Sequence, residues 1–156
     1  MATVQNREAT INSAHYAYNE RLELILFTHP YSEHGKNLAA NPSAAAAIWK
    51  KPEAWGMNLQ GVQLFGSCVR VEDAELDEAI QTYNVHFPAF RHLIHVAEDF
   101  ERDLTDLRLY RIQVERIKLI DEGRFGHGNW ITAPVIRPTA EPERKADQLA
   151  ERVSML

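Results

Sequence analysis

The chain has 156 residues, of which 45% are hydrophobic, so it can bury one good core but is short for two independent domains. Its formal net charge of −5 and the lack of any basic run argue against a nucleic-acid-binding protein, which needs a positive surface. The start is polar and no apolar run approaches the roughly 20 residues that span a bilayer, so we expect a cytoplasmic protein without a membrane segment.

The N-terminal part of the chain reads as short strands separated by polar turns. We expect strands over residues 1–5, 9–18 and 22–28, and Pro30 ends the third because proline has no amide hydrogen to donate. Within residues 9–18 neither alternating face is wholly apolar. This pattern is typical of an antiparallel barrel or sandwich.

A short helix is expected over residues 32–40. The Ser32 hydroxyl can accept a hydrogen bond from a free amide of the first turn, and Pro42 prevents continuation. Two strands should follow, over residues 43–50 and 61–72, with a polar loop between them. Gly66 lies inside the second strand and predicts a β-bulge there.

The second half of the chain begins with a helix that Asp73 would cap and that Pro88 would interrupt, before a second helical segment over 89–104. Strands return over 108–121 and 129–136. We therefore expect one domain over residues 1–137 and a helical tail over 138–156. The residues that should face the core from the first helix are Leu76, Ile80, Tyr83 and Phe87, and the tail carries a narrow apolar stripe of Ala146, Leu149, Val153 and Leu156.

The start of the helix over 32–40 has the composition of an anion site. A helix N-terminus exposes unpaired amides and the positive end of the helix dipole, and both stabilise a phosphate. Ser32, His34 and Lys36 add a hydroxyl, an imidazole and an ammonium to it. The simpler interpretation is that Ser32 only caps the helix while His34 and Lys36 are solvated, and spacing alone does not separate the two.

The order of the segments resembles that of the pyridoxamine 5′-phosphate oxidase-like family of FMN-binding split β-barrels, over about residues 1–136. The segments that carry this resemblance are "MATVQNREATINSAHYAY", "FTHPYSEHGKNLAANP", "GVQLFGSCVRV", "YNVHFPAFR" and "LYRIQVERIKLIDEGRFGHGNWITA". No single one of these motifs is highly specific, and the resemblance rests on their order.

The resemblance implies a mainly β (α+β) fold, namely an antiparallel split β-barrel with short flanking helices and the C-terminal helical tail. It also implies FMN bound at the interface of a homodimer, with the flavin ring against the second and third strands and a small-molecule substrate beside it. The residues implied at the phosphate are Thr28, Ser32, His34 and Lys36. Those implied beside the ring are Asn12, Ser13, His15 and Phe27, with Gln63 and Trp130 from the closing strands or the partner.

Two departures from the family pattern set this chain apart from the true oxidases. Where those enzymes usually carry Ser-Arg-Lys in the phosphate loop, this chain has Ser32, Glu33 and His34, and a carboxylate beside a phosphate is unfavourable. Phe87 lies about where an arginine should hold the substrate phosphate, and the terminal Arg-x-His-Asp-Arg signature is absent. We therefore expect a relative that is not a pyridoxamine phosphate oxidase.

Other chemistry-bearing residues have simpler interpretations. His92, His95 and Asp99 could face one side of a helix as metal ligands, but no fourth ligand is identifiable, so we expect no metal. Cys68, the only cysteine, reads as a small buried hydrophobe. His127 lies between glycines and could donate a proton or ligate haem iron, or could be an exposed turn residue. Of the tryptophans, Trp49 reads as structural, whereas Trp55 and Trp130 could stack on a flavin.

Two function hypotheses follow. The first is an FMN-dependent oxidoreductase that acts on a small organic substrate, in which the flavin carries the redox chemistry. The second is a non-catalytic protein that holds a flavin, a deazaflavin or a tetrapyrrole in the same groove. No residue is identifiable as a general acid or base, and flavin enzymes can transfer hydride without one.

Overall fold

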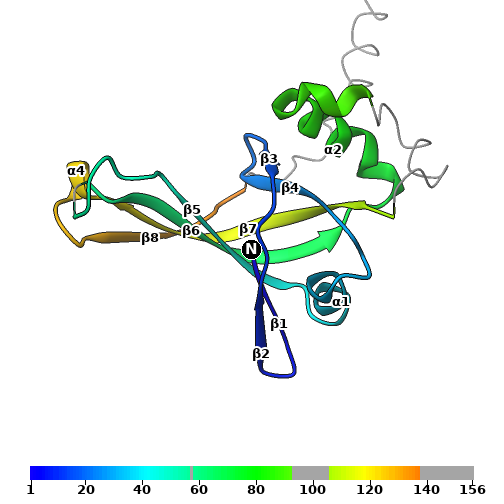
Figure 1. The fold of residues 1–156 in the computed structure, drawn as a ribbon, viewed down its shortest axis with the longest axis horizontal. Coiled ribbons are helices and arrows are strands. Elements are labelled where there is room, and N and C mark those ends of the chain that lie inside the picture. Colours follow the sequence, from blue (N-terminus) through cyan, green and yellow to red (C-terminus); the bar gives the residue numbers. More distant parts are fainter. Residues whose placement is uncertain (57, 93–105, 138–156) are drawn as a thin grey trace, which may run out of the picture.

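The computed structural model describes residues 1–56, 58–92 and 106–137, and within them eight strands form one antiparallel sheet (Figure 1). The strand order is β2-β1-β5-β6-β7-β4-β3, and β8 pairs with β7 beside this path. The strands are β1 (Ala2–Gln5), β2 (Glu8–Ile11), β3 (Tyr16–Tyr18), β4 (Glu23–Thr28), β5 (Ser43–Trp49), β6 (Gln60–Arg70), β7 (Arg108–Asp121) and β8 (Trp130–Pro134). The helical elements are α1 (Glu33–Ala40), α2 (Asp73–His86), the 3₁₀ turn η1 (Pro88–His92) and α4 (Glu122–Phe125).

These elements confirm the mainly β prediction with short flanking helices. Most of the expected strands and the helix over 32–40 are found to within a residue or two, and Ser32 is the N-cap of α1, as its spacing predicted. The predicted helical tail over 138–156 and most of the second helical segment lie outside the described residues.

One predicted strand is corrected. Residues 9–18 are not one strand but two, since β2 pairs with β1 and β3 pairs with β4. The strand order puts β2 and β3 at opposite ends of the sheet, so they are not neighbours. Residues 12–15 therefore leave the ladder of β2 with β1 and lead to the ladder of β3 with β4. The amide of Asn12 still donates to the carbonyl of Met1, and pairing stops there. We call residues 12–15 the crossing segment.

A second correction concerns the start of α2. The N-cap residue is Glu72, one position before the predicted Asp73, and its side chain makes no capping hydrogen bond. The helix ends at His86, before Pro88, as expected because proline disfavours helical backbone in the residue before it.

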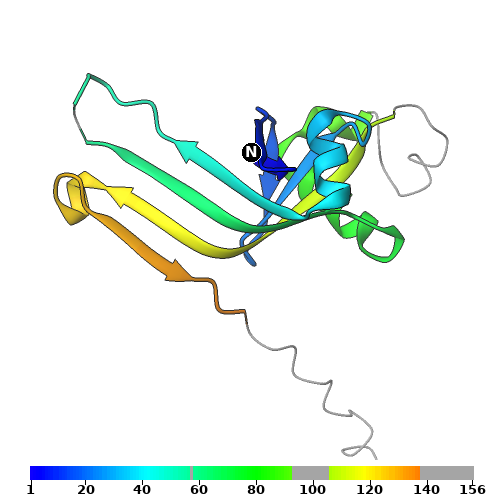
Figure 2. The same cartoon turned by 90° about the horizontal axis from the view of Figure 1, so that it is seen from below.

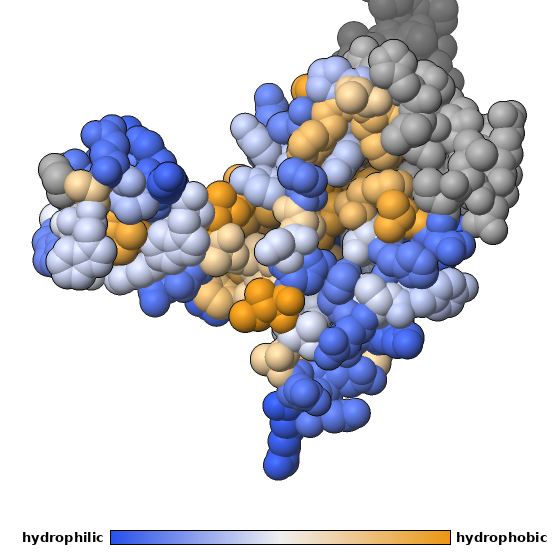
Figure 3. Space-filling view, viewed as in Figure 1, coloured by the Kyte–Doolittle hydropathy of each residue, from blue (hydrophilic) through white to orange (hydrophobic). Residues whose placement is uncertain are grey.

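Strands β5, β6, β7 and β8 extend beyond the barrel as a curved arm (Figures 1 and 2). We define the arm as residues 46–49, 60–65, 116–121 and 130–134 of β5, β6, β7 and β8, which pair side by side. Apolar surface gathers where this arm joins the body of the molecule (Figure 3). The arm therefore forms one wall of a hollow.

The bulge predicted at Gly66 is confirmed at the junction of arm and barrel. The register between β6 and β7 shifts between Phe65 and Gly66. A Cβ atom at Gly66 would lie 2.0 Å from the carbonyl oxygen of Gln113. Only glycine fits so close to a neighbouring backbone, and the extra residue on β7 increases the bend of the sheet.

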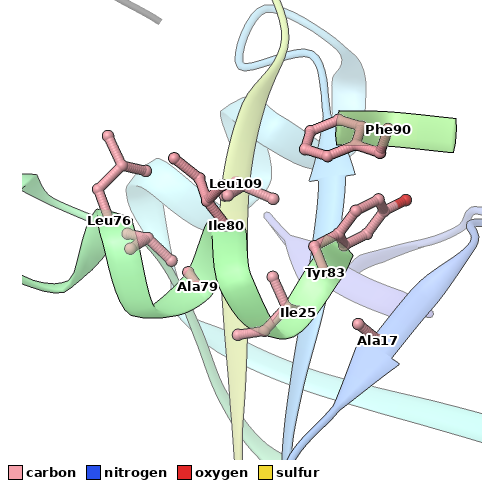
Figure 4. Packing of buried hydrophobic residues seen from close by; sticks show 9 residues of the cluster. Ala17, Ile25, Leu76, Ala79, Ile80, Tyr83, Phe90 and Leu109 are labelled. Atoms are coloured by element: carbon pink, nitrogen blue, oxygen red, sulfur yellow. The ribbon is translucent and has the colours of Figure 1, made fainter. Parts of the chain in front are cut away.

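One face of the sheet is covered by α2 (Figure 4). Leu76, Ile80 and Tyr83 of α2 pack against residues of β3, β4 and β7, and Phe90 of η1 closes the cluster. These helix residues are the ones whose spacing predicted a core face, and Phe87 packs against the cluster half-buried. The other members of this cluster are Ala17, Ile25 and Leu109 of the sheet and Val71, which follows β6.

The other face forms the barrel interior. Leu38 of α1 packs into it together with Cys68, Ile112 and Val114, all of which are buried. Along β4, Leu24 and Leu26 point into this interior, whereas Ile25 points to α2, as the alternation of a strand requires. The interior is the face that leads to the groove described next.

Candidate functional site

A groove of about 580 Å³ opens at the mouth of the barrel, between the crossing segment and the base of the arm. Strand β1 pairs with β5 only through Ala2 and Thr3, so the rest of β5 is free to form one wall. The volume is within the range of small-molecule and cofactor sites. The residues that line it are Met1, Ala2, Ile11, Asn12, Ser13, Ala14, Tyr16, Leu24, Leu26, Ala45, Ala46, Ala47, Ile48, Gln63, Phe65 and Ile112.

None of the described lining residues has a charged side chain, and most are apolar. The α-ammonium of Met1 is the charge at the lining, and it donates to the carbonyl of Asn12 at 2.7 Å. The polar side chains of the described lining are Asn12, Ser13 and Gln63, with the Tyr16 hydroxyl as a fourth polar group. The first three were predicted beside a flavin ring, and the structure brings them together around one groove. Amide and hydroxyl groups over apolar walls suit a flat heterocycle that needs a few hydrogen bonds to fix its orientation.

The small side chains of Ala45, Ala46 and Ala47 make the groove possible. Larger residues on β5 would fill the space that these alanines leave beside Leu24 and Leu26. From the sequence this alanine run predicted only a strand, although small residues at successive strand positions could also have indicated a hollow. Tyr16 belongs to the stretch "INSAHYAY" that the family resemblance places beside the ring, but it was not singled out, because its position depends on where the crossing segment ends.

The loop that precedes α1 gathers three of the four residues predicted at the phosphate. The Nε2 atom of His34 lies 2.6 Å from Thr28 Oγ1 and 3.0 Å from Ser32 Oγ. The Ser32 hydroxyl also donates to the carbonyl of His29 and accepts from the amide of Gly35. In this structure the three side chains therefore bind one another.

The charge state of this loop is set by burial. Burial is the main cause that lowers the pKa of His34 from its ordinary value, which favours the neutral imidazole near pH 7. Lys36 is exposed on α1. Glu33, the acidic residue of concern, accepts a hydrogen bond from Thr10 Oγ1 at 2.9 Å, and this contact holds its carboxylate towards β2.

The remaining predicted residues lie away from the groove lining. His15 packs edge-on against Phe87, with ring centres 5.8 Å apart. Phe27 packs against the α2 cluster on the opposite face of the sheet. Trp130 lies on the arm and meets Trp49 edge-on, with ring centres 5.8 Å apart.

The other candidate residues have structural roles where the structure describes them. Cys68 is fully buried, and burial raises the pKa of its thiol to about 12, so it carries no thiolate near neutral pH. His127 Nδ1 lies 2.8 Å from the carboxylate of Glu122, which also accepts the amides of Leu59 and Gly128. Trp55 is almost fully exposed in the loop after β5.

Within residues 1–56, 58–92 and 106–137, no group of three or more His, Cys, Asp or Glu side chains could hold a metal ion. The predicted set of His92, His95 and Asp99 lies outside the residues whose side chains are described. Among the described helices none is long and apolar enough to cross a bilayer.

Comparison with known proteins agrees with this architecture. A family model described as "Pyridoxamine 5′-phosphate oxidase" matches residues 1–121. The chain is 25% identical over 142 residues to the UPF0306 protein PM1958 of Pasteurella multocida, a match that covers 89% of this chain and 87% of that protein.

Two solved structures show the same fold. A heme binding protein from Mycobacterium smegmatis superposes with a TM-score of 0.67 at 22% identity, over 85% of this chain and 50% of that one. The chain thus spans about half the length of that protein. HutZ, the heme storage protein from Vibrio cholerae, gives a TM-score of 0.56 at 20% identity, over 73% of this chain and 78% of that one.

Proposed function

Because the chain belongs to the pyridoxamine 5′-phosphate oxidase-like family by a match over residues 1–121, we propose that it is an FMN-binding flavoprotein, an oxidoreductase acting on a small organic substrate. The chain nevertheless departs from the true oxidases at Phe87 and at the missing terminal signature. The proposed activity is therefore a flavin-dependent reaction on another substrate.

The groove at the mouth of the barrel is the observation that supports this proposal best. Its volume of about 580 Å³ and its uncharged, mostly apolar lining side chains fit the flat, largely apolar ring system of a flavin. Asn12, Ser13 and Gln63 line the groove, and their amide and hydroxyl groups can form hydrogen bonds with the polar edge of the ring. The donor set of the described residues thus fits the cofactor.

A bound flavin would supply hydride or electron transfer, and the residues of this chain would position it and exclude water. Leu24, Leu26 and Ile112 form an apolar floor that keeps solvent from one side of the ring. Thr28, Ser32, His34 and Lys36 would hold the phosphate, which requires the Thr28–His34 hydrogen bond to open or to be shared. Tyr16 and Ser13 are the described lining residues with a side-chain hydroxyl, which can donate or accept a hydrogen bond.

A second candidate function is a non-catalytic protein that holds a tetrapyrrole, a flavin or a deazaflavin. Tyr16 supports the tetrapyrrole version, because a tyrosine phenolate can ligate haem iron. The two structural neighbours named above are described as heme proteins. Among the described lining residues no histidine or cysteine is present, so Tyr16 and Met1 would be the available ligands.

The visible spectrum of the purified protein separates these functions. We expect FMN to bind and to give absorbance bands at about 370 and 450 nm, as protein-bound flavins do. An intense band at about 400 nm after haem addition, lost in a Tyr16→Phe variant, would instead favour the haem carrier. A protein that takes up neither FMN nor haem would contradict both. Reduction of bound FMN by a nicotinamide cofactor and reoxidation by a substrate would favour the enzyme over a flavin carrier.

The proposed assembly is a two-fold homodimer with two equivalent cofactor sites. One face of the arm supports it, because two cross-strand rows on that face consist only of aliphatic residues. Leu119 and Ile131 in the outer row are 37% and 43% exposed. Adjacent exposed apolar side chains of this kind are typical of a protein–protein interface. The outer row consists of Ile48, Val62, Leu119 and Ile131, and the adjacent inner row consists of Ala46, Leu64, Ile117 and Ala133.

We expect sedimentation velocity at micromolar concentration to show a dimer that Leu119→Asp with Ile131→Asp converts to a monomer. Buried carboxylates without partners would disfavour the interface. The matched control is Thr132→Asp, which adds a charge to the opposite face of the same strand. A monomeric wild-type protein that still binds one FMN per chain would rule out a site shared between subunits.

A further inference from the structure

Arg116 and Lys118 lie on β7, next to the part of β6 that forms one wall of the groove. Gln63 and Phe65 of β6 line the groove, and they pair directly with Lys118 and Arg116 of β7. Directly paired residues share a face of a sheet, and the Arg116 guanidinium carbon lies 3.8 Å from the centre of the Phe65 ring. Since neighbouring strands are about 4.8 Å apart, both cations are within reach of a ligand that lies on this wall.

Neither cation is neutralised by an acid in the described part of the chain. Arg116 stacks on Phe65, and the Lys118 ammonium lies 4.5 Å from the centre of the Trp130 ring. No carboxylate within residues 1–56, 58–92 and 106–137 forms an ion pair with either of them. Aromatic rings hold a cation in place but leave its charge available to an anion.

Two other arginines, one in the sheet and one in the turn before β4, differ in this respect. Arg111, on the same strand, pairs with Glu75 of α2. Arg21 pairs with Glu23 and Glu78. These cations tie the β3–β4 hairpin and β7 to α2. Arg116 and Lys118 are instead held over aromatic rings, at the edge of a groove whose lining side chains are uncharged.

We infer that the ligand of the groove carries a phosphate or carboxylate group that Arg116 and Lys118 bind. This inference rests on the proposed function in taking the groove as a ligand site. No side chain that lines the groove offers a charge to an anion, and the α-ammonium of Met1 already donates to the carbonyl of Asn12 at 2.7 Å. An anion is costly to desolvate without a cation. A flat ring on the wall of Gln63 and Phe65 would place an acidic substituent at the two cations, which form charge-assisted hydrogen bonds with it. The substrate class is thereby narrowed to flat acids, unless the anion is the phosphate of the cofactor itself.

The test uses Arg116→Met with Lys118→Met, which keeps most of the side-chain length and removes both charges. The probes are 8-anilinonaphthalene-1-sulfonate, an anionic dye, and Nile red, a neutral one, titrated by fluorescence. We expect the affinity for the anionic dye to fall by about fivefold to tenfold in the variant and with added salt, while Nile red is unaffected. The control Lys50→Met with Lys51→Met removes two charges that line a different cavity of the arm. An equal effect of both double variants, or none, would overturn the inference.

A second comparison identifies the source of the anion. If the pair binds the cofactor phosphate, the variant binds FMN more weakly and riboflavin as before. If it binds an acidic substrate, both flavins bind as before, and 2-naphthoate loses affinity while neutral 2-naphthol does not. Equal losses for charged and neutral partners would contradict both. If the wild type binds neither flavin, the proposed function fails, and the two dyes still decide whether the cations select an anion.

Discussion

Replacement of Gly66 by alanine is expected to lower the free energy of unfolding by about 3 kcal/mol, the largest effect of a single methyl group that this fold predicts. The added Cβ would lie 2.0 Å from the carbonyl oxygen of Gln113 and 3.1 Å from the amide nitrogen of Glu115. Backbone atoms in a sheet ladder cannot move aside as a flexible side chain can. The bulge would have to open, and the pairing of β6 with β7 would be lost locally.

Chemical denaturation followed by circular dichroism measures this effect. Gly123→Ala is the matched control, because its Cβ would meet only a side-chain oxygen of Asp121 at 3.4 Å, an ordinary contact. We expect the control to stay within about 0.5 kcal/mol of the wild type. Wild-type stability of the Gly66 variant would show that the close approach at the bulge is not maintained in solution.

The double variant His34→Ala with Lys36→Ala is expected to weaken FMN binding by about 1.5 to 3 kcal/mol for each charge-assisted hydrogen bond lost, about tenfold to more than a hundredfold in Kd. The fold should remain intact, because Ser32 still caps α1 through Gly35. Equilibrium titration of FMN measures the change, and His127→Ala with Lys50→Ala is a control of the same composition in the loops next to the arm. Unaltered affinity would place the phosphate elsewhere, and the Arg116 and Lys118 pair would be the first site to test.

The pKa of His34 adds a pH dependence to the same prediction. Burial lowers the pKa of His34 in the folded protein below its value in the unfolded chain. As the pH falls below about 6.5, the unfolded chain therefore binds a proton at His34 more readily than the folded protein does. The free energy of unfolding of the ligand-free protein should therefore be highest above about pH 6.5 and should decrease as the pH falls below that value. A phosphate beside His34 would favour the protonated imidazole, so FMN should oppose this loss, and the His34→Ala variant should lack both effects.

Local chemistry explains what the sequence could predict. Helix α1 and its Ser32 cap depend on residues next to one another, and the bulge at Gly66 follows from a glycine inside a strand. The break at residues 12–15 depends instead on β4 pairing with β3, which no local pattern reveals. Residues 24–27 are all apolar, so the sequence predicted a strand there but did not show which face of it meets α2. That assignment required the position of the helix.

The candidate site was predictable only in part for the same reason. Thr28, Ser32 and His34 are close in sequence, and the structure places them in contact. Asn12, Ser13 and Gln63 meet across the groove, yet the floor of Leu24, Leu26 and Ile112 comes from strands distant in sequence. Arg116 and Lys118 went unnoticed because their meaning depends on the register of β7 with β6.

The pairing of β4 with β7 also bears on how the chain acquires its structure during synthesis. Residues 23–28 find their partner strand only in residues 108–113, so the barrel cannot close until most of the chain has left the ribosome. Contacts between such distant segments carry a large loop-closure cost and are associated with slow folding. Until β7 arrives, the apolar strand β4 has only the short β3 beside it. We expect nascent chains that stop before residue 108 to be sensitive to proteases and prone to aggregation.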